Sequence, residues 1–586
     1  MRVKQDSLTK LTRPLQLLSF GLMLLFLTAG GANAQVWTKG SQLLPLCAQI
    51  APLPPATGTA GQVQVSSGAR MACFGPQSGS GTAVAAARLQ SRTASASGSP
   101  GGSGSKNSFT GTNMDAATPV EDQTNGTQSY GQSEVSIAAV GPYVVEAWND
   151  ATGFFAASCS PNFKDQLTGF GFSSDGGATF TDLGGLPNIN CATSVFEGDP
   201  SVEAFQSGGH TYFYISSLFF DAIEGAEKIE MDACEVVGSS LSCNQTPIVI
   251  ADPGFGGFDD KDFMSIDAKR GLLYVTYTNF TFTPTSFDQI QLSVCDIGNG
   301  ALGGTALQPV CNSTSPSPAY LTLAAAPFSS CAEIEGSYPA VDPRTGDIYA
   351  AYESNWATNQ SFCTVPVQNV LVYVAANCIA LPNPSPCSGA TASTSVNITS
   401  MDAAFVPGYS RFPGNDFPRL AVSDPAGTVS MVWNDAGNNP LGDVVLQSFD
   451  LASLTPVQSA PVKLDNDGIA GNLHFLPAVR NADANGNLNV TWYDRRLNPN
   501  TGLTDVYAAL GVNPRTASTP KSNVRVTNVS SNWLAVSSDI NPNFGDYTDN
   551  YVEMTPGSGF SAMIYAAWSD GRISDPQPFN AHQGSK

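Results

Sequence analysis

A two-strand phrase recurs seven times between residues 133 and 570. Each copy has an alternating apolar strand, a turn that usually contains Gly, and a second strand that ends in an aromatic and a polar residue. The copies occupy residues 133–150, 199–216, 262–279, 338–355, 417–435, 476–494 and 545–570. A repeat of this kind restricts the chain to an array or ring of similar units.

The spacing of the copies sets the size of one unit. Val145 and Tyr565 occupy equivalent positions in the first and last copies, and the six intervals between them average 70 residues. A four-stranded blade with long loops has this size, whereas a β-sandwich domain needs about 100 residues. We therefore predict an all-β fold, a β-propeller of four-stranded blades.

The end of the chain leaves the number of blades open. Seven copies favour seven blades, but the last copy ends near Arg572 and only residues 573–586 come after it. The outer strands of a seventh blade would then have to come from elsewhere, and residues 35–74 could supply them. The alternative is six blades, with the two end copies sharing one.

Composition supports this class of fold and excludes others. The chain has 56 Gly and 40 Pro, which disfavour long helices. Its formal net charge is −22, from 26 Lys and Arg against 48 Asp and Glu. A nucleic-acid-binding protein would show a basic surface instead. An acidic ligand would need a local cluster of Arg to overcome this charge.

The regions before the repeat have other roles. Residues 1–34 combine a basic start, an apolar run of about 13 residues and a small-residue cleavage pattern, which is typical of a secretory signal. Residues 35–74 could dock on the propeller, and residues 75–130 form a Gly- and Ser-rich linker. The propeller is predicted at 131–572 and a C-terminal tail at 573–586. We expect a secreted protein, or a periplasmic one in a Gram-negative host, with no membrane span after cleavage.

Export makes the twelve cysteines candidates for disulfides. Their number is even and no Cys-x-x-Cys pair occurs, which disfavours a zinc site. Sequence alone cannot fix the connectivity. Sequential pairing is our hypothesis: Cys47–Cys73, Cys159–Cys191, Cys234–Cys243, Cys295–Cys311, Cys331–Cys363 and Cys378–Cys387.

One short motif resembles a known family. Residues 173–180 read SSDGGATF, which matches the S-x-D-x-G-x-T-[W/F] aspartate box of sialidase-like (BNR-repeat) propellers. The resemblance covers about residues 130–572. The motif has a structural task, the turn between the two outer strands of a blade. Its matching positions are Ser173, Asp175, Gly177, Thr179 and Phe180.

The resemblance implies a site with three arginines, a tyrosine nucleophile and an acid. Tyr547 matches the nucleophile best, because Tyr547-Thr548-Asp549 lies in the last copy. The candidate arginines are Arg419, Arg480 and Arg572, and the candidate acids are Glu134 and Asp199. The early arginine of the family is absent, since no Arg lies between Arg92 and Arg270. An alternative for Arg572, as for Arg495, is an ion pair with the preceding Asp.

Two functions follow as hypotheses. One is an exo-glycosidase of the sialidase type, which removes a terminal acidic sugar from a glycan or glycoprotein and requires no cofactor. The alternative is a non-catalytic propeller that binds carbohydrate or protein. Acids at inner-strand starts could gather at one channel mouth and hold Ca²⁺, or each could cap its own turn. These acids are Glu134, Asp199, Asp262, Asp416 and Asp546. The sequence does not predict an oligomeric state.

Overall fold

The structure is a computed structural model. It describes residue 109, residues 112–118 and most of 131–585, with internal gaps of which the longest is 402–415. The predicted signal, residues 35–74 and most of the predicted linker lie outside the described residues. No helix of the described part is long and apolar enough to cross a bilayer.

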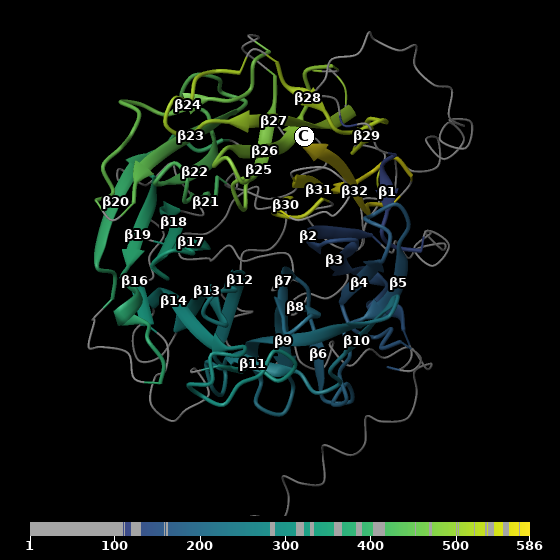
Figure 1. The fold of residues 1–586 in the computed structure, drawn as a ribbon. Helices are drawn as coiled ribbons and strands as arrows, with labels where there is room; N and C mark the ends of the chain where they lie inside the picture. Colours follow the sequence, from purple (N-terminus) through teal and green to yellow (C-terminus); the bar gives the residue numbers. More distant parts are fainter. Residues whose placement is uncertain are drawn as a thin grey trace, which may run out of the picture.

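The fold is an all-β propeller, as predicted from the repeat (Figure 1). The first three blades, in chain order, contain β2 (Gln132–Val140), β3 (Tyr143–Asp150), β4 (Thr168–Ser173) and β5 (Thr181–Gly185); β6 (Ser194–Phe196), β7 (Ser201–Ser207), β8 (His210–Asp221), β9 (Ala226–Val237), β10 (Ser240–Cys243) and β11 (Ile248–Ala251); and β12 (Phe258–Asp267), β13 (Leu272–Thr281), β14 (Phe287–Asp296), β15 (Val310–Cys311) and β16 (Leu321–Pro327).

The remaining blades follow the same order. They contain β17 (Glu333–Val341), β18 (Ile348–Trp356), β19 (Gln368–Val374) and β20 (Ala392–Asn397); β21 (Arg419–Ser423), β22 (Thr428–Asp435), β23 (Asp443–Asp450) and β24 (Val462–Lys463); β25 (His474–Ala478), β26 (Leu488–Asp494), β27 (Leu503–Val512), β28 (Val524–Arg525) and β29 (Ser531–Asn532); and β30 (Asp549–Glu553), β31 (Ala562–Asp570), β32 (Gln577–Ser585) and β1 (Met114–Asp115). The described residues also contain two short 3₁₀ turns, Ala151–Phe155 and Ala376–Cys378.

The described strands form six sheets, of which one has eleven strands. That large sheet joins the second and third blades through a single parallel pairing, Phe258 with Glu227. Divided at this point, the described strands form seven antiparallel units. Figure 1 shows them around a common centre, with β2, β7, β12, β17, β21, β25 and β30 innermost.

The last blade is built from both ends of the described chain. β32 pairs along β31, and β1 pairs with β32, Met114 opposite Asn580. The prediction of a C-terminal tail at 573–586 was therefore wrong, and residues 114–115 of the predicted linker are a strand. The physical reason is that β31 would otherwise present an unpaired edge. Phe579 and Ala581 of β32 are buried in the apolar cluster between this blade and the sixth.

The repeated aromatic and polar ending has a structural cause. Three tryptophans donate their indole N–H to the carboxylate two residues later: Trp433 to Asp435 (3.2 Å), Trp492 to Asp494 (2.9 Å) and Trp568 to Asp570 (2.8 Å). A buried indole N–H needs an acceptor. The Trp-x-Asp spacing supplies one within the same strand in these three blades, whereas the Trp148 indole N–H, with the same spacing to Asp150, has no hydrogen-bond partner among the described residues.

Four of the seven inner strands have a bulge near their amino-terminal ends. The register shifts between Ser133 and Ser136 in β2, and a comparable shift occurs in β12, β17 and β25. Residues inside these bulges have positive φ, as at Glu134 (54°) and Lys261 (53°). A bulge inserts one residue and re-aims the side chains that follow. It therefore sets which side chains face the channel.

The described disulfides agree with the predicted pairs. They are Cys159–Cys191, Cys234–Cys243 and Cys295–Cys311. Cys378 is also disulfide-bonded, and its predicted partner Cys387 lies outside the described residues, as do Cys47, Cys73, Cys331 and Cys363.

The motif at 173–180 forms the turn between β4 and β5, the outer strands of the first blade. The Asp175 carboxylate accepts hydrogen bonds from the Thr179 backbone N–H (2.9 Å) and the Thr179 hydroxyl (2.6 Å). The Ser173 hydroxyl accepts one from the Gly177 N–H (2.9 Å), and Gly177 has φ of +85°. Only Gly adopts such a φ at low cost.

Candidate functional site

Arg419, the first residue of β21, lies in an aromatic cluster at the channel. Its guanidinium carbon is 4.3 Å from the Phe263 ring centroid, 5.1 Å from that of Tyr338 and 5.4 Å from that of Tyr547. The residue is only 4% exposed, and its Nη1 has no hydrogen-bond partner in the described part of the chain. Stacking on aromatic faces offsets part of the cost of burying the charge.

Tyr547 is in contact with this arginine but is not prepared for nucleophilic attack. Its hydroxyl donates to the Pro200 carbonyl oxygen at 3.0 Å. Burial raises the pKa of Tyr547 well above its ordinary value, and the charges of Asp199 and Glu134 add to the shift. A nucleophile needs a lowered pKa or an adjacent base that accepts its proton. Here the proton is held by a backbone carbonyl instead.

Arg480 follows β25 and is also buried. Its Nη1 is 2.5 Å from the Asp549 carboxylate, and its Nη2 is 3.3 Å from the Glu203 carboxylate and donates to the Val202 carbonyl. The Ser136 hydroxyl is a further acceptor, at 3.3 Å from Nη1. Two carboxylates of the protein therefore already neutralise this guanidinium.

Arg572 lies outside the aromatic cluster around Arg419. Its prediction as one of three arginines of the site was therefore wrong. Its Nη2 bonds the Asp570 carboxylate at 2.6 Å, and its guanidinium carbon lies 4.1 Å from the Phe579 ring centroid. Arg496 repeats this arrangement with Asp494 (2.6 Å) and Tyr507 (4.2 Å). The Trp-x-Asp-x-Arg spacing is thus a structural unit. In the sixth blade it is Arg496, not Arg495, that pairs with the aspartate.

Glu134 and Asp199 lie at the amino-terminal ends of the inner strands, near Tyr547. The Glu134 carboxylate accepts from the Asn149 side chain (2.7 Å) and from the backbone N–H of Asp546 (2.7 Å). The Asp199 N–H donates to the same Asn149 side chain at 2.6 Å. Glu134 thereby joins the first and seventh blades rather than capping its own turn.

The other predicted acids are also buried and hold the mouth of the channel together. Asp546 pairs with Lys261 at 2.8 Å. Asp416 accepts from the backbone N–H of Met401 and from the Asn434 side chain. Asp262 accepts from the Ser216 hydroxyl. Burial raises the pKa of Asp416 and of Asp262 well above the ordinary value.

A cavity of about 390 Å³ opens at the other end, where the inner strands finish. Glu203, Arg480 and Tyr551 line it, and the Arg480 guanidinium lies 5.9 Å from the Tyr551 ring centroid. Its volume is within the range of small-molecule sites. The remaining lining is mixed, with apolar and polar groups: Met264, Ser265, Ile266, Pro339, Ala340, Val341, Pro343, Val422, Asp424, Pro425, Asn481, Ala482, Asp483, Ala484 and Met554.

Sequence reasoning missed several of these residues. Glu203, Tyr338, Asp549 and Tyr551 were not among the candidates, although all lie on inner strands. A signal was present: Tyr338 follows the bulge of β17 at the position that Arg419 occupies in β21, since they pair with Ala351 and Val432 in matching registers. Reading alternate positions after each inner-strand start would have found them.

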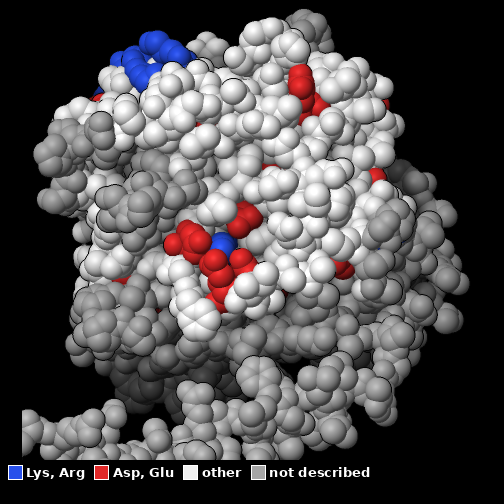
Figure 2. Space-filling view, turned by 90° about the horizontal axis from the view of Figure 1, so that it is seen from below, with Lys and Arg blue, Asp and Glu red and all other residues white. Residues whose placement is uncertain are grey.

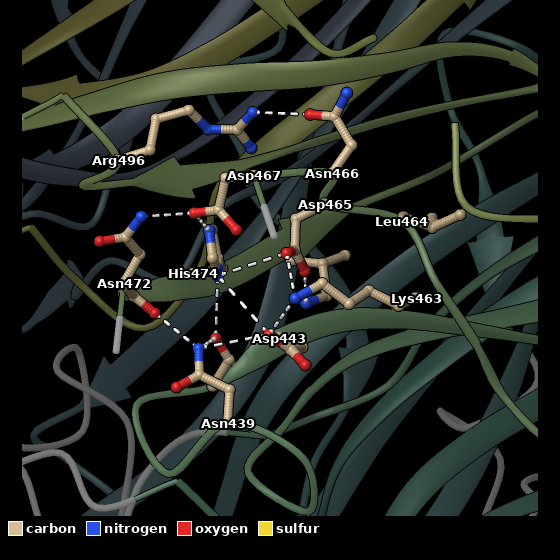
Figure 3. A network of polar contacts seen from close by, with 12 residues as sticks. Asn439, Asp443, Lys463, Leu464, Asp465, Asn466, Asp467, Asn472, His474 and Arg496 are labelled. Atoms are coloured by element: carbon tan, nitrogen blue, oxygen red, sulfur yellow. Dashed lines mark hydrogen bonds and ion pairs between the residues drawn. The ribbon is translucent and has the colours of Figure 1, made fainter. Parts of the chain in front are cut away.

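Figure 3 shows a second polar network, between the fifth and sixth blades. His474 lies with Nε2 3.1 Å from Asp467 and Nδ1 3.7 Å from Asp465 and 3.9 Å from Asp443. The ligand atoms of Asp443, Asp465 and His474 are close enough together for a metal site. Lys463, however, places Nζ 2.8 Å from both carboxylates. The Lys463 ammonium group thus neutralises the two carboxylates in place of a metal ion.

We predict that the loss of the His474 proton makes the protein less stable as pH rises. Burial alone would lower the pKa of His474, but the hydrogen bond with Asp467 and the charges of Asp494 and Asp465 outweigh it and raise the pKa. A raised pKa adds stability below the unfolded value of about 6.5, and this gain is lost as pH rises through the folded pKa. The facing charged groups are Asp443, Lys463, Asp465, Asp467 and Asp494.

The measurement is the urea midpoint at pH 5.5 and pH 8.5 for the protein and for His474→Gln. The wild type should lose more stability between these values than the variant does. His210→Gln is the control, because His210 is exposed and has one carboxylate partner, Glu235. Equal losses in the wild type and His474→Gln would contradict the assignment.

The comparisons with known proteins find weak structural similarity. No family model and no curated protein matches the chain. A Hadza microbial sialidase, Hz136, is 10% identical with a TM-score of 0.33, over 67% of this chain and 66% of that one. The GH43_1 enzyme from Xanthomonas citri complexed with xylose is 13% identical with a TM-score of 0.26, over 55% of this chain and 89% of that one. The propeller assignment rests on the sheets of the chain itself.

Proposed function

We propose that this propeller binds carbohydrate and accommodates a sugar residue in the 390 Å³ cavity. The observation that carries the proposal is the make-up of that cavity. Tyr551 offers an aromatic ring for the C–H face of a sugar, while Glu203, Asn481 and Asp483 offer acceptors and donors for hydroxyl groups. Polar groups set beside apolar surface in one hollow are typical of a ligand site.

The charge of the cavity favours a neutral sugar over an acidic one. Arg480 is the basic residue in its lining, and Glu203 and Asp549 already engage its guanidinium. Glu203, Asp424 and Asp483 add three carboxylates. A ligand carboxylate would meet no free guanidinium fork and would be repelled.

Tyr551→Ala should weaken glycan binding about tenfold, because an aromatic anchor at the centre of a site carries much of the binding energy. The measurement is a glycan array to identify the ligand, followed by titration calorimetry with the strongest binder. Tyr212→Ala is the matched control, since Tyr212 is partly buried on β8 and is not among the cavity-lining residues. Equal affinity of Tyr551→Ala and wild type would reject the cavity as the site.

Sialidase-type hydrolysis is the second candidate. It is favoured by the contact between Arg419 and Tyr547 and by the free Nη1 of that arginine. In this reading Glu134 or Asp199 acts as the acid. Release of a fluorophore from a sialoside by the wild type, with none by Tyr547→Phe, would establish it. No turnover by the purified wild type would reject it for that substrate.

A further inference from the structure

Two glutamates that the predicted site did not include lie side by side within the second blade. Glu197 follows β6 directly, and Glu227 lies in β9 at the pairing that joins the second and third blades. Glu197 is 1% exposed and Glu227 is fully buried. Their carboxyl groups are close enough to form a hydrogen bond with each other when one is protonated.

As carboxylates these two groups have no donor to satisfy them. All four of their oxygens are buried without a hydrogen-bond partner in the described chain. An ionised carboxylate can only accept hydrogen bonds, so the pair cannot bond to itself without a proton. Buried charges are normally paired or bound to a metal, because an isolated one is costly.

The surroundings add negative charge instead of neutralising it. Burial raises the pKa of Glu227 most, and the negative charges of Glu197, Asp260 and Asp199 raise it further. The nearby Lys261 is engaged by Asp546 at 2.8 Å. No ion pair between either glutamate and a Lys or Arg occurs in the described residues. On the surface, Figure 2 shows acidic side chains gathered around one basic group on an otherwise largely uncharged face.

We propose that Glu197 and Glu227 bind a calcium ion. Two adjacent glutamates provide up to four anionic oxygens, the ligands that Ca²⁺ prefers, and water or backbone oxygens can complete its shell of six to eight. Mg²⁺ suits the pair less well, because it demands near-ideal octahedral geometry and keeps several waters. The ion would fasten β6 and β9 at the junction with β12, away from the sugar cavity.

A proton competes with the ion for this pair. Both carboxyl groups must lose their protons before they can bind a cation. Metal binding then releases protons, and affinity increases with pH. The affinity for Ca²⁺ should therefore be higher at pH 8.5 than at pH 6.5.

The test is calorimetric titration of the protein with CaCl₂, together with thermal unfolding in Ca²⁺ and in EDTA. We expect one bound ion and a rise in the midpoint of about 2–4 °C at saturating Ca²⁺. Glu227→Gln should lower the affinity at least tenfold and abolish the rise. Glu230→Gln is the matched control, because Glu230 is a buried carboxyl on the same strand and lies beside Lys228. It should keep the full response.

The outcomes separate calcium binding from a shared proton. Absence of a heat signal and of a midpoint shift in the wild type would overturn the proposal, whatever the variants do. A full calcium response in Glu227→Gln would also overturn it. If that variant does not fold, Glu197→Gln takes its place, and the wild-type titration stands by itself. Sugar binding is measured separately, with Tyr551, so failure of one proposal leaves the other intact.

Discussion

Arg480→Met lowers the free energy of unfolding by about 3–5 kcal/mol, because it leaves two buried carboxylates without their cation. Asp549 is 2.5 Å and Glu203 is 3.3 Å from the guanidinium in the intact protein. Asp549 also accepts from the Ser136 hydroxyl (2.8 Å) and the Ile137 N–H (3.1 Å). Arg480 thus connects inner strands of four blades, and its loss weakens each of these junctions.

Urea unfolding followed by tryptophan fluorescence measures the change. Arg344→Met is the control, because Arg344 also pairs with two aspartates, Asp342 and Asp424, but its side chain is 52% exposed. Exposed ion pairs contribute about 0–1 kcal/mol. A loss below about 1 kcal/mol for Arg480→Met would show that the channel pair is not a structural element.

Asp570→Ala has the second largest expected effect, also about 3–5 kcal/mol of stability. Its carboxylate accepts from the Trp568 indole (2.8 Å), the Arg572 guanidinium (2.6 Å) and the Ser531 hydroxyl (2.8 Å). The substitution leaves a buried indole N–H without its acceptor and a largely buried guanidinium without its carboxylate partner. It also removes the hydrogen bond from Ser531, which connects β29 of the sixth blade to the seventh blade.

Asp175→Ala is the matched control for this substitution. Asp175 also accepts several hydrogen bonds, from Ser173 and Thr179, but it is exposed in the turn between β4 and β5. Its replacement should cost about 1 kcal/mol, the usual value for a solvent-accessible hydrogen bond. Equal urea midpoints for Asp570→Ala and Asp175→Ala would contradict the role given to Asp570.

The fold was predictable because the copies of the repeat share their local sequence features. Alternating apolar residues and a turn that usually contains Gly recur through the copies, and four of the seven copies end in Trp-x-Asp. The closure of the last blade was not predictable, because β32 has few apolar residues and β1 is only two residues long. Their pairing depends on the unpaired edge of β31, which is a tertiary property.

The candidate site was predictable in part. Arg419, Arg480 and Tyr547 reach the channel because they lie on, just after or just before an inner strand, respectively. Arg572 resembled them in residue type only, since its spacing from Trp568 places it in a structural unit at the end of β31. The carboxylates that pair with Arg480 come from other blades. No local sequence pattern could therefore indicate that its guanidinium is already neutralised.

The most direct test of the proposed function is a crystal structure of the protein with the glycan selected on the array. The proposal predicts density for a sugar residue in the cavity at the carboxyl-terminal ends of the inner strands, packed on Tyr551 and within hydrogen-bond distance of Glu203 or Asn481. Sugar density at the opposite mouth, with a carboxylate on Arg419 and the anomeric carbon beside Tyr547, would contradict it and would support the hydrolase instead.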